Sequence, residues 1–267
     1  MTFSCKRGVP QMDDYRDAIA SCGRQLRLSA NLADNSFAIE GETHQEYLYN
    51  LLSTEIKCRK AARIGKLINS AGFPVQHNFA AFHPDEVQFP SGVTPESLKA
   101  LEFFHAGNNL VMYGSTGTGK TMLSICIGME ACRSGIPVKF FRTASLINQL
   151  SETQERGSLA QFHKKLDKAD ILILDEFGYV PYNRTGAQLL FDYLSEIHEK
   201  KVIILNTNLE FSRWVNVLYD EQMTAALVGR LSHHCQRILC PGENNRLRES
   251  SINDMFASRQ KGGARNA

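Results

Sequence analysis

Residues 108–121, NNLVMYGSTGTGKT, decide the fold of this chain. The apolar run Asn109–Tyr113 has the composition of a buried strand, and the pattern of Lys120–Cys132 predicts a helix soon after it. Between them, Gly114–Thr121 fits G-x-x-x-x-G-K-[ST]. Glycines let the backbone approach a phosphate group closely, and the first N–H groups of a helix point at the anion. The stretch therefore predicts a phosphate-binding loop between a strand and a helix.

Short apolar strands alternate with helical segments beyond this loop. Strands are predicted at Val138–Phe141, Ile171–Leu174 and Val202–Leu205, and helices at Ser145–Glu155 and Gly186–His198. The runs ILIL and VIIL lack polar alternation, which is typical of a parallel sheet covered on both faces. The sequence therefore predicts an α/β fold with a doubly wound parallel β-sheet flanked by helices.

Length and composition predict a folded protein with one large domain and a smaller appendage, since 267 residues compare with ~150 per domain. Hydrophobic residues make up 43% and charged residues 22%, which excludes global disorder. No apolar run approaches the ~18 residues of a membrane span, so we expect a cytoplasmic protein without membrane contact. Seven cysteines without a CxxC spacing fit neither a secreted disulfide framework nor a zinc ribbon.

A helical region is predicted before the α/β region. Within it, a long helix is expected at His44–Ser70, because apolar residues recur at helical spacing and Gly72 and Pro74 follow as stop signals. The expected organisation is a helical N-terminal domain over 1–75, a connector over 76–95, the α/β domain over 96–249 and a disordered tail over 250–267.

Two carboxylates, Asp175 and Glu176, follow the strand ILIL at the end where such sheets bind ligands. Lys120 is expected to contact the β- and γ-phosphates of ATP, while Thr121 and Asp175 bind Mg²⁺. Glu176 is expected to orient and deprotonate the attacking water; two solvated acids capping a strand are the alternative. The expected nucleotide-contacting residues are Gly114, Ser115, Thr116, Gly117, Thr118, Gly119, Lys120, Thr121 and Met122.

Further polar residues follow in the sequence. The strand VIIL runs into Asn206-Thr207-Asn208, and we choose Asn208 over Asn206 as the contact to the water or the γ-phosphate; an ordinary turn is the alternative. Arg230, in a predicted helix at Met223–Leu231, is a candidate to reach a neighbouring subunit's γ-phosphate, with a surface arginine as the alternative. The nearby His233-His234-Cys235 lacks a carboxylate at metal-ligand spacing, so a metal site there is disfavoured.

Basic residues gather in the long predicted helix. Between Ile56 and Ile68 there are five positive charges and no acid, and phosphate is a natural partner for such a face. No base-recognition motif accompanies them, so binding to duplex DNA would be largely independent of sequence; a solubilising face is the alternative. The expected DNA contacts are Lys57, Arg59, Lys60, Arg63 and Lys66.

The segments GSTGTGKT, ILILDEFGYVP, VIILNTN followed by FSRW, and ALVGRLSHH together resemble the IstB-like helper ATPases of insertion-sequence transposition. These belong to the AAA+ superfamily near the DnaC-type helicase loaders. The resemblance extends to LLSTEIKCRKAARIGKLINSAGFP and covers about residues 12 to 250. Two departures from the family pattern remove no catalytic group: Ser115 and Thr116 stand where proline is usual, and Gly229 where Asp is common.

The resemblance implies an AAA+ ATPase domain behind a helical N-terminal domain, ATP-dependent self-assembly on DNA and delivery of target DNA to a transposase. It assigns Lys120 and Thr121 to Walker A, Asp175 and Glu176 to Walker B, Asn208 to sensor 1, and Arg230 to a finger acting between subunits of a homo-oligomer. Two alternatives stay open. A DnaC-like helicase loader would share every nucleotide-site residue, and a small-molecule P-loop kinase would need neither the basic helix nor Arg230.

Overall fold

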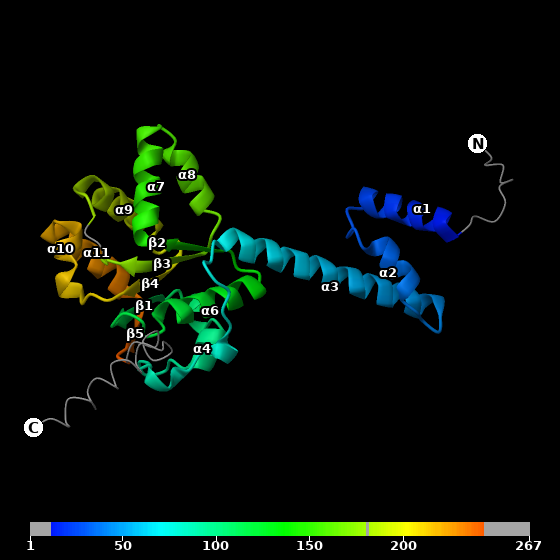
Figure 1. Ribbon diagram of the computed structural model, residues 1–267, viewed down its shortest axis with the longest axis horizontal. Helices are drawn as coiled ribbons and strands as arrows, with labels where there is room; N and C mark the ends of the chain where they lie inside the picture. The colour runs from blue at the N-terminus through cyan, green and yellow to red at the C-terminus, as the bar shows by residue number, and fades with distance from the viewer. Residues whose placement is uncertain (1–11, 180–181, 243–267) are drawn as a thin grey trace, which may run out of the picture. The chain divides into compact units, whose positions relative to one another are not determined.

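The computed structural model describes residues 12–179 and 182–242 of the chain (Figure 1). The predicted tail at 250–267 lies outside these residues. The chain divides into two compact units, a helical unit that ends at Lys66 and an α/β unit that begins at Leu67. The division falls within helix α3 (His44–Ala71), earlier in the chain than the limit of 75 expected from the sequence.

Five parallel strands form the centre of the α/β unit, in the order β2-β3-β4-β1-β5. Their bounds are β1 (Asn109–Gly114), β2 (Val138–Arg142), β3 (Ile171–Phe177), β4 (Val202–Thr207) and β5 (Cys235–Cys240). The parallel sheet and its four predicted strands are confirmed. β5 was not predicted, because it is an edge strand whose Gln236 and Arg237 interrupt the apolar pattern that marks the buried strands.

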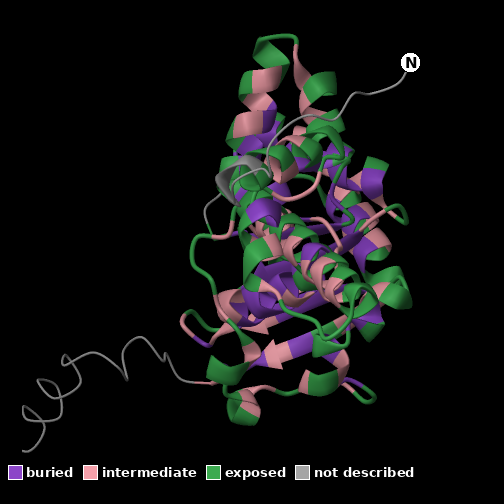
Figure 2. Ribbon diagram, turned by 90° about the vertical axis from the view of Figure 1, so that its right-hand side faces the viewer, coloured by how far each residue is buried: buried purple, intermediate pink, exposed green. Residues whose placement is uncertain are grey.

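Alternate strand residues pack into two hydrophobic layers, one on each face of the sheet. In β3, Ile171 and Ile173 belong to one layer, and Leu172 and Leu174 to the other. Figures 1 and 2 show the helices that cover the faces and the buried residues between them. Fully burying such a side chain contributes about 1.5–3 kcal/mol, so these layers hold the strand ends in fixed positions. The first layer includes α4 (Pro95–Lys99), α5 (Glu102–His105) and α6 (Lys120–Arg133), and the second α7 (Thr143–Glu155), α9 (Arg184–Ile197), α10 (Val215–Leu218) and α11 (Glu221–His233).

Shorter elements complete this unit. The expected connector at 76–95 includes η1 (Phe79–Ala81) and η2 (Pro84–Glu86), and its Phe82 and Val93 are buried in the first layer. Its Gln88 exchanges two backbone hydrogen bonds with Leu239, so the segment covers the outer side of β5. The remaining elements are α8 (Leu159–Leu166), which follows α7, and η3 (Phe211–Arg213) after β4.

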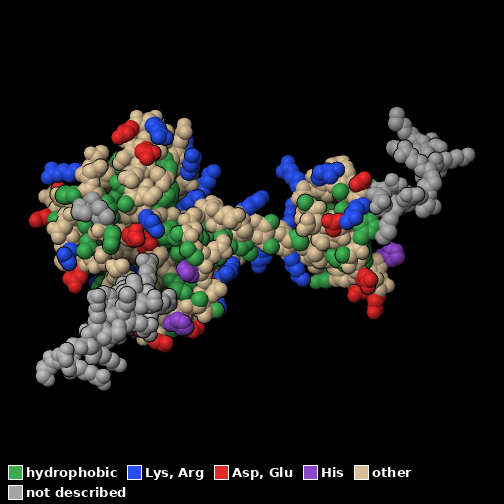
Figure 3. Space-filling view, viewed as in Figure 1, with side chains coloured by type: hydrophobic (Ala, Val, Ile, Leu, Met, Phe, Trp, Pro, Cys, Tyr) green, Lys and Arg blue, Asp and Glu red, His purple; other side chains and the backbone are tan. Residues whose placement is uncertain are grey.

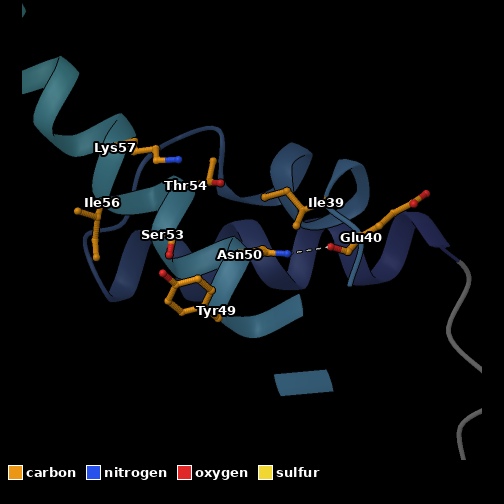
Figure 4. A pocket seen from close by; sticks show the side chains of 8 residues that line it. All are labelled: Ile39, Glu40, Tyr49, Asn50, Ser53, Thr54, Ile56 and Lys57. Carbon is orange, nitrogen blue, oxygen red and sulfur yellow. Dashed lines mark hydrogen bonds between the residues drawn. The ribbon is translucent and has the colours of Figure 1, made fainter. Parts of the chain in front are cut away.

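The helical unit comprises α1 (Met12–Gln25), α2 (Leu32–Ala38) and the part of α3 up to Lys66. Thr43 caps α3, since its Oγ1 accepts a hydrogen bond from the Glu46 N–H. α3 has its predicted start at His44 and ends one residue past Ser70, with Gly72 at a φ of +79°. An open hollow of about 600 Å³ in this unit is lined by residues that include Glu40, whose carbonyl accepts from Asn50 (Figure 4).

Among the described residues, no helix combines the length and the apolar character that crossing a membrane requires.

Candidate nucleotide site and nucleic-acid interface

The phosphate-binding loop connects β1 to α6 as the sequence predicts. Its first glycine, Gly114, has a φ of +148°, and a Cβ there would lie 2.0 Å from the Cys240 carbonyl oxygen, so the position requires glycine. Gly119 takes the left-handed conformation immediately before the first turn of α6. Ser115 and Thr116 are exposed at the tip, and Met122 is partly buried against the first hydrophobic layer.

The Lys120 ammonium lies inside this loop. It donates to the carbonyl oxygens of Gly114 at 2.8 Å and Ser115 at 2.5 Å, and its Nζ lies 3.4 Å from the Thr118 hydroxyl. Burial lowers the pKa of Lys120, with Cys240 and Asp175 acting in the opposite direction. The loop therefore gathers a cation and a helix start at one point, which is the electrostatic requirement for binding phosphate.

A buried hydrogen-bonded cluster joins the start of α6 to the ends of β3 and β4. The Thr121 Oγ1 lies 3.0 Å from both carboxylate oxygens of Asp175, which is 4% exposed. Asn206 Nδ2 donates to Asp175 Oδ1 and to Ser124 Oγ, each at 2.9 Å. The Ser124 hydroxyl in turn donates to the Thr121 carbonyl oxygen at 2.9 Å. Sequence reasoning missed Ser124 and passed over Asn206.

These residues have the chemistry of a magnesium site. Mg²⁺ prefers oxygen ligands and is commonly held by one or two carboxylates, with water and phosphate oxygens as further ligands. Asp175 and Thr121 supply such oxygens beside the phosphate-binding loop. Asn206 Oδ1 is buried and has no hydrogen-bond partner among the described residues, so the cluster retains an unused acceptor. The residues present therefore fit the metal that the sequence predicts.

Glu176 has the opposite environment from its neighbour Asp175. The pairing of β3 with β4 shifts register between Leu174 and Phe177, and Glu176 adopts a φ of +57°. Two threonine hydroxyls hold this irregularity: Thr143 donates to the Asp175 carbonyl at 2.8 Å, and Thr207 to the Phe177 carbonyl at 2.9 Å. The Glu176 side chain is 51% exposed. One carboxylate is thus buried against α6 while the next faces solvent.

Arg142 lies beside Glu176 and was not identified from the sequence. Its Nε is 3.8 Å from Glu176 Oε2, and both side chains are more than half exposed. An exposed ion pair of this kind contributes little to stability, typically about 0–1 kcal/mol. Because both side chains are more than half exposed, the Glu176 carboxylate remains accessible to solvent beside Arg142.

Asn208 and Arg230 are not part of the buried cluster. Asn208 is exposed just beyond the end of β4, and the γ-phosphate contact predicted for it stays a prediction. Arg230, in α11, places its guanidinium carbon 5.5 Å from the centroid of the Phe191 ring of α9. Its Nη1 is buried without a hydrogen-bond partner among the described residues.

Near the end of α11, within the part of the chain that the structure describes, His233, His234 and Cys235 are consecutive in the sequence. No group of three or more metal-ligating side chains occurs there. Cys235 and Cys240 are the two ends of β5, and burial raises the pKa of each thiol to about 11.

The five basic residues of α3 are all exposed on the helical unit, and Figure 3 shows Lys and Arg side chains along this helix. One of them also has partners inside the unit. Arg59 Nη2 donates to the Arg27 carbonyl oxygen at 2.6 Å, and its Nε lies 3.6 Å from the carboxylate of buried Glu55. The other four predicted phosphate contacts have no such partners among residues 12–179 and 182–242: Lys57, Lys60, Arg63 and Lys66.

The amino-acid sequence matches a known protein family and several of its members. The sequence matches the family described as IstB-like ATP binding protein over residues 27–253. It is 31% identical over 212 residues to the insertion sequence IS5376 putative ATP-binding protein of Geobacillus stearothermophilus, covering 79% of this chain and 84% of that protein. It is also 31% identical over 209 residues to the insertion sequence IS21 putative ATP-binding protein of Pseudomonas aeruginosa, covering 77% and 78%.

The fold has a solved counterpart in AMPPCP-bound DnaA from Aquifex aeolicus. The TM-score is 0.51 at 17% sequence identity, over 68% of this chain and 57% of that chain. This similarity and the five-stranded parallel sheet confirm the predicted fold class, an α/β core with a phosphate-binding loop and a parallel sheet flanked by helices, behind a helical N-terminal region. The resemblance found in the sequence is likewise confirmed, and the chain belongs to the IstB-like ATP-binding proteins of insertion sequences.

Proposed function

We propose that this chain is an ATP-dependent DNA-binding helper of transposition, which assembles on duplex DNA, hydrolyses ATP and recruits a transposase. The observation that supports the proposal most is the pair of adjacent carboxylates in opposite environments. Asp175 is buried against Thr121 beside the phosphate-binding loop, while Glu176 faces solvent. Such a pair divides the work of binding a metal and activating water between two side chains.

Hydrolysis follows from the roles of these residues. The backbone N–H groups of the loop and the Lys120 ammonium bind the β- and γ-phosphates, with Lys120 exchanging the loop carbonyls for phosphate oxygens. Glu176 orients a water and takes its proton as the water oxygen bonds to the γ-phosphorus and the bond to the bridging oxygen breaks. ADP and inorganic phosphate are the products.

Thr121 and Asp175 would hold Mg²⁺ in this site. When bound, the metal supplies positive charge that offsets the charge on the phosphate oxygens. Phosphate release from ATP, measured with Mg²⁺ and then with excess chelator, tests the activity. We expect release only with the metal, and an absence of release under both conditions, with or without DNA, would contradict the proposal.

A homo-oligomer with ATP sites at subunit interfaces is the proposed assembly. Arg230 would supply a positive charge to the neighbouring subunit's γ-phosphate, and Asn208 would contact the γ-phosphate or the attacking water within its own subunit. Stacking on Phe191 would keep the guanidinium ordered for that contact.

Duplex DNA is the proposed ligand of α3. The exposed side chains of Lys57, Lys60, Arg63 and Lys66 offer four positive charges along one helix, and phosphate contacts of this kind do not depend on base sequence.

A transposase is the proposed protein partner, because the relatives are named as insertion-sequence ATP-binding proteins. The test is capture of the transposase of the same insertion sequence by the tagged, ATP-loaded protein on DNA. Retention of the transposase with ATP and not with ADP is expected. Retention of a replicative helicase in its place would favour a helicase loader.

A further inference from the structure

Asn206 is the penultimate residue of β4 and is 1% exposed. Side chains two residues apart in a strand point to the same face, so Asn206 shares a face with Ile204, which packs in the layer that contains α6. An amide among such apolar residues needs hydrogen bonds to offset the loss of water. Asn206 is therefore a buried amide that follows four apolar residues of the same strand.

The hydrogen bonds of Asn206 converge on the predicted metal carboxylate. Nδ2 donates to Asp175 Oδ1 and to Ser124 Oγ, each at 2.9 Å. The Ser124 hydroxyl gives its own proton to the Thr121 carbonyl oxygen, so it can only accept from the amide. Because Thr121 also contacts Asp175, these four residues form a closed set around one carboxylate.

Two features make this set more than a packing arrangement. Asp175 is buried, so fixing its carboxylate orientation requires a partner inside the protein, and Asn206 reaches it from β4 while Thr121 reaches it from α6. In addition, the Asn206 Oδ1 is buried without a partner among the described residues, which a purely structural amide would avoid. The first feature follows if the amide fixes the Asp175 carboxylate for a ligand, and the second leaves an acceptor available on the same amide.

We propose that Asn206 is a positioning residue, which orients the Asp175 carboxylate for Mg²⁺ and makes ATP binding dependent on the metal. The inference rests on the proposed function, since it concerns the same site. Residues that hydrogen-bond a metal ligand without touching the metal fix its orientation, and replacing them typically weakens metal affinity about 10–100-fold. The exposed Asn208 stays outside this role.

The test measures binding of a fluorescent ATP analogue, first in excess chelator and then as Mg²⁺ is raised. Asn206→Leu keeps the branched shape of the side chain and removes both hydrogen bonds. We expect its affinity in chelator to match that of the unchanged protein, while the Mg²⁺ concentration for half of the metal effect rises about 10–100-fold. Asn148→Ala, at an exposed position in α7, is the matched control and should titrate like the unchanged protein.

A folded Asn206→Leu protein with an unaltered Mg²⁺ titration would overturn the inference. If that variant does not fold, Asn206→Val and Asn206→Thr replace it, because both are β-branched residues suited to a strand and differ in a single hydroxyl donor. The valine variant should lose the metal effect, and the threonine variant should keep more of it. Equal, unaltered titrations for both would overturn the inference. If the unchanged protein itself showed no effect of Mg²⁺ on ATP binding, the proposed function would fail first.

Discussion

Asp175 and Glu176 are neighbours in the chain, yet the fold separates them into two environments. The left-handed backbone at Glu176 and the hydroxyl groups of Thr143 and Thr207 turn one carboxylate inward and leave the next in solvent. A non-glycine residue in this conformation costs about 1–3 kcal/mol, which the surrounding hydrogen bonds must offset. The proposed division of roles between metal ligand and base therefore depends on a local irregularity of β3.

Replacing Lys120 by Ala tests the phosphate site at the level of one residue. The variant loses a charged hydrogen-bond donor, so ATP binding should weaken by about 1.5–3 kcal/mol, or roughly 10- to 150-fold. Fluorescence titration measures the affinity, with Lys99→Ala, an exposed lysine of α4, as the control. Unchanged ATP affinity in the Lys120 variant would remove the lysine from the site.

For single residues, some site positions can be predicted from the sequence and others cannot. The phosphate-binding motif around Lys120 can be recognised from the sequence alone, because its glycines and lysine occur at fixed spacing before a helix. Asn206 and Asn208 have the same side chain two positions apart, and only the end point of β4 decides that the first is buried and the second exposed. The contact between Arg142 and Glu176 could not be predicted from the sequence either, because it depends on the register of β2 against β3.

At the scale of elements, α3 combines two kinds of basic residue. Arg59 is tied to the Arg27 carbonyl and to the buried Glu55, whereas Lys60 and Arg63 have exposed side chains without such ties. The run of basic residues in the sequence predicts the basic face. It does not show that one of them, Arg59, also makes contacts inside the helical unit. That distinction decides which substitutions can probe DNA binding without disturbing the unit.

Changing Lys60 and Arg63 together to Ala should weaken DNA binding to a similar degree on unrelated sequences. Each phosphate neutralised on duplex DNA contributes about −0.9 to the slope of log K against log salt, so the slope should flatten by roughly 1–2 per protomer. The measurement is a salt series of binding isotherms on two unrelated duplexes. Lys99→Ala combined with Lys168→Ala, two exposed lysines of the α/β unit, is the matched control. An unchanged slope and affinity would reassign the face to solvent or to a protein partner.

Some strands of the sheet can be predicted from the sequence, and one cannot. The central strands β3 and β4 are predictable because they begin with four apolar residues that are buried on both faces, while the edge strand β5 contains Gln236 and Arg237, which interrupt such a pattern. It pairs with β1 on one side, and on the other side its Leu239 pairs with Gln88 from a distant part of the chain. Local sequence does not encode a pairing of this kind.

At the scale of the whole molecule, we propose that a second subunit completes the ATP site. Arg230→Ala should leave ATP binding to the free protein intact and suppress hydrolysis, because the contact belongs to the neighbour's site. Mixing this variant with Glu176→Gln should restore part of the activity, since some interfaces then join an intact Glu176 to an intact Arg230. Phosphate release from the mixture measures the recovery. No recovery in assemblies shown to contain both variants would argue against a contact between subunits.

The central claim is that duplex DNA stimulates ATP hydrolysis that depends on Glu176. The most direct measurement is phosphate release with and without duplex DNA, for the unchanged protein and for Glu176→Gln, with ATP binding followed in parallel. We predict that DNA accelerates release by the unchanged protein, whereas Glu176→Gln binds ATP normally and loses about 10²–10⁴-fold of the rate. A rate that DNA does not change, or a normal rate in the Glu176→Gln protein, would contradict the account.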